Sequence, residues 1–520
     1  MLRQVRLPGG IIEGVPSGDP RVTVFKGVPY AKAPVGDLRW RSPQPYDTCW
    51  DGVRRMDTFP PMCYQTLPGS DPAEFWTREL NPTATEYRMS EDCLYLNIWS
   101  PAKSENEKLP VYFWIHGGGM QAGYSYEMEF NGEKMAREGV IMITVGYRLN
   151  IFGWMAHPEL TQEEPDAPHG NYCLQDLIFA LQWVQDHIEA FGGDPTHVTI
   201  GGQSGGAGAV ISLLSSPLAK GLFSSAISQS GGGLRAFGYG TDCTLLSDAE
   251  QTGIEIFKML GVTSVDEARR LPANVIYEAY RNIGGGFNRW SPRVDGVLLP
   301  ESTLDCMIRN HHHDVPYILS YTAGEGPGTP AGGPLPETMQ AFRIMMDRIF
   351  GAEAEAMIDK YQIGTLEKAI AYCQSDVMNS RFISAHAYLQ AEANHMRMAD
   401  YCCEFDHDIP GEDQPGAYHG SDLWFTFNSV DRSWRPFRGK HYDLARQVIG
   451  YWANFIKTGD PNGQDHNGET LPEWKPWRAE DPFVLAFRDE PQRKNSIMSD
   501  AAADRIQYHL KSYDKSRKRL

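Results

Sequence analysis

Short apolar runs alternate along the chain with segments whose apolar residues recur at helical spacing. The run Leu174, Leu177, Leu181 and Val184 places its side chains on one face of a helix ending near 188, and a second such helix is expected over 442–457. Strands alternating with helices predict a mostly parallel sheet covered on both faces. The runs expected to form buried strands are 94–99, 111–115, 140–145, 198–200, 226–228, 315–320 and, as a possible last strand, 483–487.

The 520 residues contain neither an internal repeat nor a low-complexity linker, and 41% of them are hydrophobic, which is enough for a large core. The segments at about 235–310 and 330–400 have mainly helical patterns and lie between expected strands. We therefore expect residues 1–520 to form a single α/β domain, in which these two segments are helical insertions that cap one edge of the sheet.

Charge narrows the range of partners. The chain carries a formal net charge of −18, which repels phosphate backbones and anionic lipid, so neither nucleic acid nor a membrane surface is an expected partner. No apolar run approaches transmembrane length and the first residues do not resemble a signal peptide, which favours the cytoplasm, although secretion of a longer precursor is not excluded. The sequence does not indicate the oligomeric state.

Metal chemistry has little support in the sequence. Nine cysteines include no C-x-x-C pair, and the run of histidines at 311–313 is more typical of a solvated loop because three adjacent side chains cannot easily face one ion. We expect no metal and no organic cofactor.

The segment Gly202-Gln203-Ser204-Gly205-Gly206 is the most informative motif. It follows the expected strand 198–200 and precedes a small, apolar helical stretch, which is the context of a nucleophile elbow. In such a turn the serine is exposed on a strained backbone, and glycines on either side avoid clashes with the strand and the helix. Ser204 is therefore the candidate nucleophile.

A serine nucleophile needs donors for the oxyanion that forms during acyl transfer. His116-Gly117-Gly118-Gly119 directly follows the expected strand 111–115, as the HGGG-type loop of lipases and esterases does. The backbone N–H groups of Gly118, Gly119 and Gly205 are the natural donor set.

The serine also needs a base and an acid that orients the base. Glu325 lies just past the expected strand 315–320, at the end of a strand where catalytic loops gather in open α/β sheets. His419 is flanked by small residues, and the order Ser204, Glu325, His419 is the Ser…acid…His order of α/β-hydrolases.

Four longer stretches, at 25–40, 90–98, 191–206 and 452–462, resemble the sequence signatures of type-B carboxylesterases, the group that includes para-nitrobenzyl esterases, liver carboxylesterases and cholinesterases. The resemblance covers nearly the whole chain and implies the α/β-hydrolase fold. It implies a triad of Ser204, His419 and Glu325 with an oxyanion hole of Gly118, Gly119 and Gly205. It also implies ion pairs between Arg39 and Glu91 and between Arg148 and Asp176, and a disulfide between Cys63 and Cys93. This chain departs from the family at Gly205, where relatives usually have alanine.

The sequence thus predicts a serine carboxylesterase that hydrolyses small carboxylic esters through an acyl-enzyme intermediate. An amidase, thioesterase or lactonase with the same triad is the alternative, and a non-catalytic cholinesterase-like binding protein is a third possibility. The natural substrate does not follow from the motifs. Large apolar residues proposed as pocket walls are Met120, Phe287 and Trp424, together with Trp290.

Overall fold

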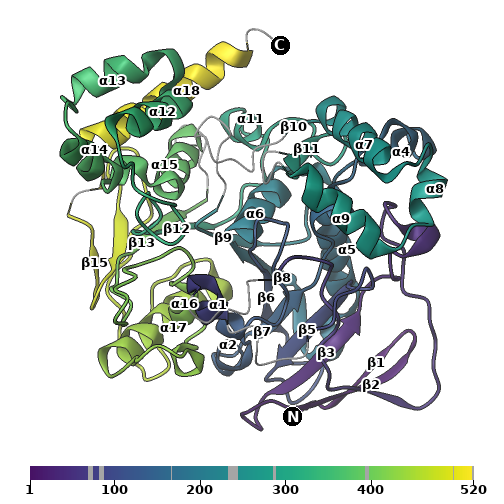
Figure 1. Cartoon of the computed structure of the whole chain (residues 1–520). Coiled ribbons are helices and arrows are strands. Elements are labelled where there is room, and N and C mark those ends of the chain that lie inside the picture. Colours follow the sequence, from purple (N-terminus) through teal and green to yellow (C-terminus); the bar gives the residue numbers. More distant parts are fainter. Residues whose placement is uncertain are drawn as a thin grey trace.

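The computed structural model describes residues 1–67, 74–80, 87–165, 167–231, 244–284, 289–392, 398–495 and 497–517. Its core is one large twisted sheet that runs through the middle of the molecule, with helices on both sides (Figure 1). In the described residues the sheet has 13 strands in the order β1-β2-β3-β5-β7-β6-β8-β9-β12-β13-β14-β15, with β4 paired to β2. The fold is that of an α/β-hydrolase, as expected.

The strands follow the sequence pattern closely in the centre of the sheet. Each of the seven expected strands is present, and β8 extends on both sides of its apolar segment 198–200. β13 was not expected, and neither were the N-terminal strands β1 to β4 or the short β15. The strands of the large sheet are β1 (Gln4–Leu7), β2 (Gly10–Pro16), β3 (Thr23–Pro29), β4 (Val53–Met56), β5 (Tyr95–Ser100), β6 (Leu109–Ile115), β7 (Ile141–Val145), β8 (Gly193–Gln203), β9 (Ser225–Gln229), β12 (Tyr317–Thr322), β13 (Asp400–Phe405), β14 (Val484–Phe487) and β15 (Pro491–Arg493).

Parallel pairing in the centre brings the carboxyl ends of the strands to one edge. β7, β6, β8, β9, β12, β13 and β14 are consecutive neighbours and all pair in parallel. In this register Ile115 at the end of β6 pairs with Gly202, and Gln203 at the end of β8 pairs with Gln229. Loops that leave β6, β8, β12 and β13 therefore start close together in space.

Side chains of the central strands alternate between two cores. Phe113 of β6 belongs to the same buried cluster as Leu177 of α5, whereas Trp114 belongs to the cluster that contains Trp452 of α17. The alternation confirms a sheet buried on both faces, with α5 (Tyr172–His187) over one face and α17 (Lys440–Thr458) over the other.

Among the described residues, the segments at about 235–310 and 330–400 are largely helical. The first contains α7 (Leu246–Leu260), α8 (Val265–Arg269), α9 (Ala273–Ile283) and α11 (Thr303–Ile308), with the short parallel pair β10 (Thr244–Leu245) and β11 (Arg293–Val294). The second contains α12 (Met339–Phe350), α13 (Ala354–Lys360), α14 (Leu366–Cys373) and α15 (Ser380–Glu392). The remaining helices are α1 (Phe75–Leu80), α2 (Glu133–Arg137), α3 (Asn150–Trp154), α4 (Pro158–Glu163), α6 (Gly205–Ser215), α16 (Leu423–Thr426) and α18 (Asp500–Arg517).

Both expected ion pairs are present and buried. The Arg39 guanidinium donates to both carboxylate oxygens of Glu91, each at 2.7 Å, and Arg148 donates to Asp176 from Nε and Nη2 at 2.8 and 2.6 Å. Arg39 Nη1 also donates to the backbone oxygen of Leu271 at 2.8 Å. Arg39 therefore fixes the N-terminal segment against the first insertion, and both ion pairs specify geometry more than they add net stability.

The prediction of a disulfide between Cys63 and Cys93 is wrong for this structure, because both residues are free, buried thiols. The two thiols interact by a hydrogen bond, and this bond together with burial raises the pKa of Cys93 well above its usual value. The Cys93 sulfur is therefore a protonated thiol near neutral pH, and its contact with Cys63 is a hydrogen bond instead of a covalent bond.

No helix among the described residues combines the length and the apolar character that a bilayer crossing requires.

Candidate active site

Ser204 lies in the sharp turn between β8 and α6. Its φ of 56° and ψ of −120° are unusual for a residue with a side chain, and its N–H donates to the backbone oxygen of Gln229 at 2.8 Å. A Cβ on Gly202 would lie 2.5 Å from the Gly206 carbonyl carbon, and one on Gly206 would lie 2.1 Å from the Ile115 oxygen. The turn thus has no space for side chains at these glycines, which is the physical reason for the motif.

The glycine loop that follows β6 lies directly against this turn. Gly118 and Gly119 have φ values of +90° and +64°, and neither N–H donates a hydrogen bond to any described residue. A Cβ built on Gly205 would come within 2.6 Å of the Gly119 nitrogen. The backbones of Gly119 and Gly205 are therefore in close contact beside Ser204, with two N–H donors available to a ligand.

His116 is buried and holds the start of the glycine loop through a hydrogen bond and a ring contact. Its ring stacks on Tyr147 at 4.4 Å between centroids, and its Nδ1 donates to the Gly117 oxygen at 2.9 Å. Burial lowers the pKa of His116 to about 4. The imidazole is therefore neutral at pH 7 and adds no charge beside the loop.

Glu325 and His419 form a hydrogen-bonded pair at the carboxyl ends of β12 and β13. His419 Nδ1 lies 2.9 Å from Glu325 Oε2, and because a carboxylate only accepts, Nδ1 carries the hydrogen. Oε1 of Glu325 accepts from the N–H and Oγ1 of Thr322 at 3.2 and 3.1 Å. Burial would raise the pKa of Glu325, but His419 and Arg381 outweigh it and hold the pKa below its usual value. The pair thus consists of an ionised acid and an oriented imidazole.

The Nε2 of His419 faces the end of β8. It lies 3.2 Å from the Gln203 side-chain nitrogen, which donates because Nε2 is the free acceptor of this tautomer. Among the described residues, no hydrogen bond joins His419 to Ser204 Oγ. Catalytic hydrogen bonds are often longer without substrate and tighten in the complex, so this geometry brings the two residues to one site without yet connecting them.

Ser204, His419 and the three consecutive glycines line one pocket of about 590 Å³. Its other walls come from segments that are far apart in sequence. They include Trp76 and Leu80 of α1, Tyr124, Phe130, Tyr418 and the residues Leu423 and Trp424 of α16. The volume and the aromatic walls are typical of a small-molecule site.

Three acidic side chains on this pocket, Glu79, Glu127 and Glu129, were not predicted from the sequence. Burial raises the pKa of Glu127 to about 7 and that of Glu129 well above its usual value. Glu79 is held by the Arg435 guanidinium and by the Tyr418 hydroxyl, which lies 2.6 Å from Glu79 Oε2. No local motif marks these residues, because only the fold brings their segments to the pocket.

The expected pocket walls fare differently. Trp424 lines the pocket, whereas Phe287 lies outside the described residues. Met120 is a correction, since its side chain is fully buried in the core and is absent from the described lining. Its backbone oxygen instead accepts from Asn150 N–H and Trp154 Nε1 at 3.0 and 3.2 Å, which fixes the end of the glycine loop. Trp290 is likewise buried and away from the described lining.

The substitution Gly205→Ala should slow the ester hydrolysis that the sequence predicts. The new Cβ would lie 2.6 Å from the Gly119 nitrogen and 2.7 Å from the Met120 nitrogen, so the glycine loop must shift. Displacing an oxyanion donor by a few tenths of an ångström should lower kcat for a short-chain nitrophenyl ester by about 10- to 100-fold. Initial-rate kinetics measure this effect.

Gly364→Ala is the matched control, because a Cβ at Gly364 meets no atom within 4 Å and the residue has no positive φ. It should leave kcat unchanged. Full activity in Gly205→Ala would show that the loop yields without cost and that the close contact has no role in the reaction.

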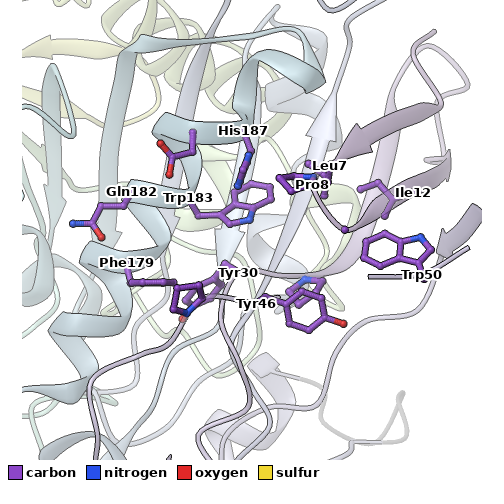
Figure 2. A pocket seen from close by; sticks show the side chains of 14 residues that line it. Leu7, Pro8, Ile12, Tyr30, Tyr46, Trp50, Phe179, Gln182, Trp183 and His187 are labelled. Atoms are coloured by element: carbon purple, nitrogen blue, oxygen red, sulfur yellow. The ribbon is translucent and has the colours of Figure 1, made fainter. Parts of the chain in front are cut away.

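A separate cavity of about 260 Å³ lies where the N-terminal strands meet α5, and among described residues it shares none with the pocket of Ser204. Figure 2 shows the indole of Trp183 from α5 beside the ring of His187, with Tyr46 and Trp50 on the opposite side. The Trp50 Nε1 donates to the Ile11 oxygen at 2.9 Å, so its ring packs the N-terminal hairpin against the segment near 50. We therefore interpret this cavity as a gap between aromatic side chains that pack the N-terminal strands against α5.

The geometry has counterparts among known proteins. The model of the carboxylesterase family matches residues 2–506. The fumonisin B1 esterase of Sphingopyxis macrogoltabida is 31% identical over 469 residues, which cover 87% of this chain and 81% of that protein. The phenmedipham hydrolase of Pseudarthrobacter oxydans is 30% identical over 488 residues, covering 90% and 92%. A solved PNB esterase is 26% identical, with a TM-score of 0.78 and coverage of 98% of this chain and 100% of that one.

Proposed function

Because the chain belongs to the carboxylesterase family and is a serine carboxylic ester hydrolase, we propose that Ser204, His419 and Glu325 carry out its reaction. The observation that carries this assignment is the 2.9 Å hydrogen bond between His419 and Glu325 in a site that opens on the same pocket as Ser204. The three residues follow three strands of one parallel array, whose carboxyl ends meet at this edge.

In the acylation step Ser204 Oγ attacks the ester carbonyl carbon while His419 Nε2 accepts the hydroxyl proton. The carbonyl oxygen becomes an oxyanion and accepts from the N–H groups of Gly118, Gly119 and Gly205. Donors fixed in the backbone cost no reorganisation as charge develops, and each contributes about two to three orders of magnitude to the rate. His419 then gives its proton to the alcohol oxygen, the bond to the carbonyl carbon breaks, and the alcohol leaves.

In the deacylation step a water molecule takes the place of the alcohol. His419 accepts a proton from this water, the resulting hydroxide attacks the acyl carbon, and the same N–H groups bind the second oxyanion. Collapse of this intermediate returns the proton to Ser204 and releases the carboxylic acid. Glu325 stays ionised throughout and stabilises the imidazolium that forms twice in each cycle.

Gln203 makes a hydrogen bond that substrate binding has to break. Its amide occupies His419 Nε2 in the free protein, at 3.2 Å. Substrate binding must therefore exchange the Gln203 hydrogen bond for one from Ser204 Oγ.

The assignment is tested by covalent labelling. An organophosphate should modify one serine stoichiometrically, and peptide mass spectrometry should locate the adduct on Ser204, because this hydroxyl lies in one pocket with a candidate base and candidate oxyanion donors. A saturating short-chain ester should slow the labelling. An adduct on another serine, or loss of activity without any adduct, would remove the basis of the assignment.

We further propose that residues 1–520 form a single hydrolase domain with insertions at about 235–310 and 330–400. Central strands on both sides of each segment support this division, since β9, β12 and β13 are neighbours in the sheet. The net charge of −18 supports a small-molecule substrate and speaks against nucleic acid or an anionic membrane surface as partner. The free thiols of Cys63 and Cys93 support a reducing compartment such as the cytoplasm.

A further inference from the structure

A second large cavity lies on the other side of His419. It has a volume of about 580 Å³ and shares Ala331, Arg381 and His419 with the pocket that contains Ser204. Much of its wall comes from α12 and α15 of the second insertion and from α18, which form the helical group at the upper left of Figure 1. The two cavities are therefore adjacent, and His419 lies on the lining of both.

This cavity is lined by positively charged side chains, although the chain as a whole is acidic. Lys and Arg total 48 against 66 for Asp and Glu, yet Arg348, Arg381 and Arg505 all line the cavity. Glu325 is the sole carboxyl group on the described lining, and its Oε2 already accepts from His419 Nδ1. The space beside the candidate base is thus locally positive inside an acidic protein.

The three guanidinium groups reach the cavity from different depths. Arg348 lies in the last turn of α12 and is exposed, and its guanidinium forms no hydrogen bond or ion pair with another described residue. Arg381 Nε lies 3.6 Å from Glu325 Oε2, which is beyond hydrogen-bond distance, and its side chain remains 24% exposed. Arg505 is buried and donates from Nη1 to the Val377 oxygen. Arg348 therefore has the guanidinium that is most open to a ligand.

The rest of the wall is largely apolar. Its apolar lining residues include Ile344, Met345, Ile349 and Met378. Such a cavity matches a hydrocarbon arm that ends in an anion, because the methylene groups contact the apolar wall while the charge reaches the guanidinium groups.

We propose that this cavity binds a carboxylate carried by one arm of the ester substrate, with Arg348 as the residue that selects for it. The inference rests on the proposed function, since it places the arm relative to Ser204. A carboxylate fits better than a phosphate, because Glu325 on the same lining repels a doubly charged group more strongly. The planar fork of arginine also matches the two oxygens of a carboxylate.

The test compares matched esters with and without a terminal carboxylate. Nitrophenyl hexanoate is paired with the mono-nitrophenyl ester of adipic acid to probe the acyl arm. Hexyl acetate is paired with its analogue that ends in a carboxylate to probe the alcohol arm, and titration of the released acid follows its hydrolysis. Steady-state kinetics give KM and kcat for each ester with the wild-type enzyme and the variants Arg348→Gln, Arg348→Lys and Arg343→Gln.

On one of the two arms, Arg348→Gln should raise KM for the carboxylate ester about three- to tenfold and leave the neutral ester and both kcat values unchanged. Arg348→Lys should retain most of the preference, and the difference should shrink in high salt. Arg343→Gln is the matched control, because Arg343 is on the same helix but is absent from the described lining and pairs with Glu355 at 3.0 Å.

Equal KM changes for charged and neutral esters in Arg348→Gln, on both arms, would overturn the proposal. So would an equal effect of Arg343→Gln, because the preference would then reflect overall charge. Neither result affects the proposed function, which depends on hydrolysis of the neutral esters by Ser204. If labelling shows that Ser204 is not the nucleophile, the proposed function fails first and independently of any carboxylate preference.

Discussion

Ser204→Ala should reduce hydrolysis of short-chain nitrophenyl esters by about four to six orders of magnitude in kcat. The substitution removes the hydroxyl that we propose forms the acyl-enzyme bond. The glycine-loop donors and the pocket walls stay in place, so a slow residual reaction above the background in water is expected. Stopped assays with high enzyme concentration can measure such a rate, and labelling by an organophosphate should disappear.

Ser212→Ala is the matched control for this experiment. Ser212 lies on α6 two turns beyond Ser204, is buried, and donates to the Gly208 oxygen at 2.9 Å. Its loss should cost about 1 kcal/mol of stability and leave kcat unchanged. Wild-type rates in Ser204→Ala would rule out the assigned nucleophile, provided that the variant is free of wild-type contamination.

Glu325→Gln should lower kcat by about three to four orders of magnitude. A glutamine can present its NH₂ group to His419 Nδ1, which favours the wrong imidazole tautomer, and it cannot stabilise the imidazolium by charge. The pKa of Glu325 is already held below its usual value, so its carboxylate is ionised at neutral pH and protonates only at more acidic pH. The carboxylate is therefore present throughout about pH 6 to 8, and kcat of the variant should stay below that of the wild type over this whole range.

Glu404→Gln separates this effect from the loss of any buried acid. Glu404 is also buried, on β13, and accepts from Lys494 Nζ at 2.7 Å. Its variant should melt at a lower temperature but keep its kcat in the folded state. A similar loss of kcat in both variants would mean that Glu325 acts through folding alone.

The central sheet was predictable because its strands are continuous apolar runs, which is the pattern of strands buried on both faces. β13 was missed because Asp400 and Glu404 interrupt its apolar run. Glu404 is satisfied by Lys494, which lies just beyond the last strand, and this partner is not visible in a local window. The strands β1 to β4 at the N-terminus are mixed in polarity, so no continuous apolar run marks them in the sequence.

The candidate site was predictable where a single loop supplies both the residue and its setting. The residues next to Ser204 and next to the glycines after β6 indicate a tight turn at the end of a strand. His419 and Glu325 were predicted from their position after Ser204 in the chain and, for Glu325, after a strand. The pocket walls were not predictable, because Trp76, Phe130 and Leu423 come from separate segments. Met120 shows the same limit, since a large apolar side chain next to a catalytic loop points into the core as readily as into a pocket.

The parallel register that joins β8 to β12 and β13 also sets an order of events during synthesis. The proposed nucleophile follows β8, whereas its proposed base follows β13 and lies more than two hundred residues later in the chain. At about 5 to 20 residues per second, a ribosome needs roughly 10 to 40 seconds to make the stretch between them. A nascent chain therefore carries the elbow serine for many seconds without the means to activate it, and esterase activity should appear only after four fifths of the protein has been translated.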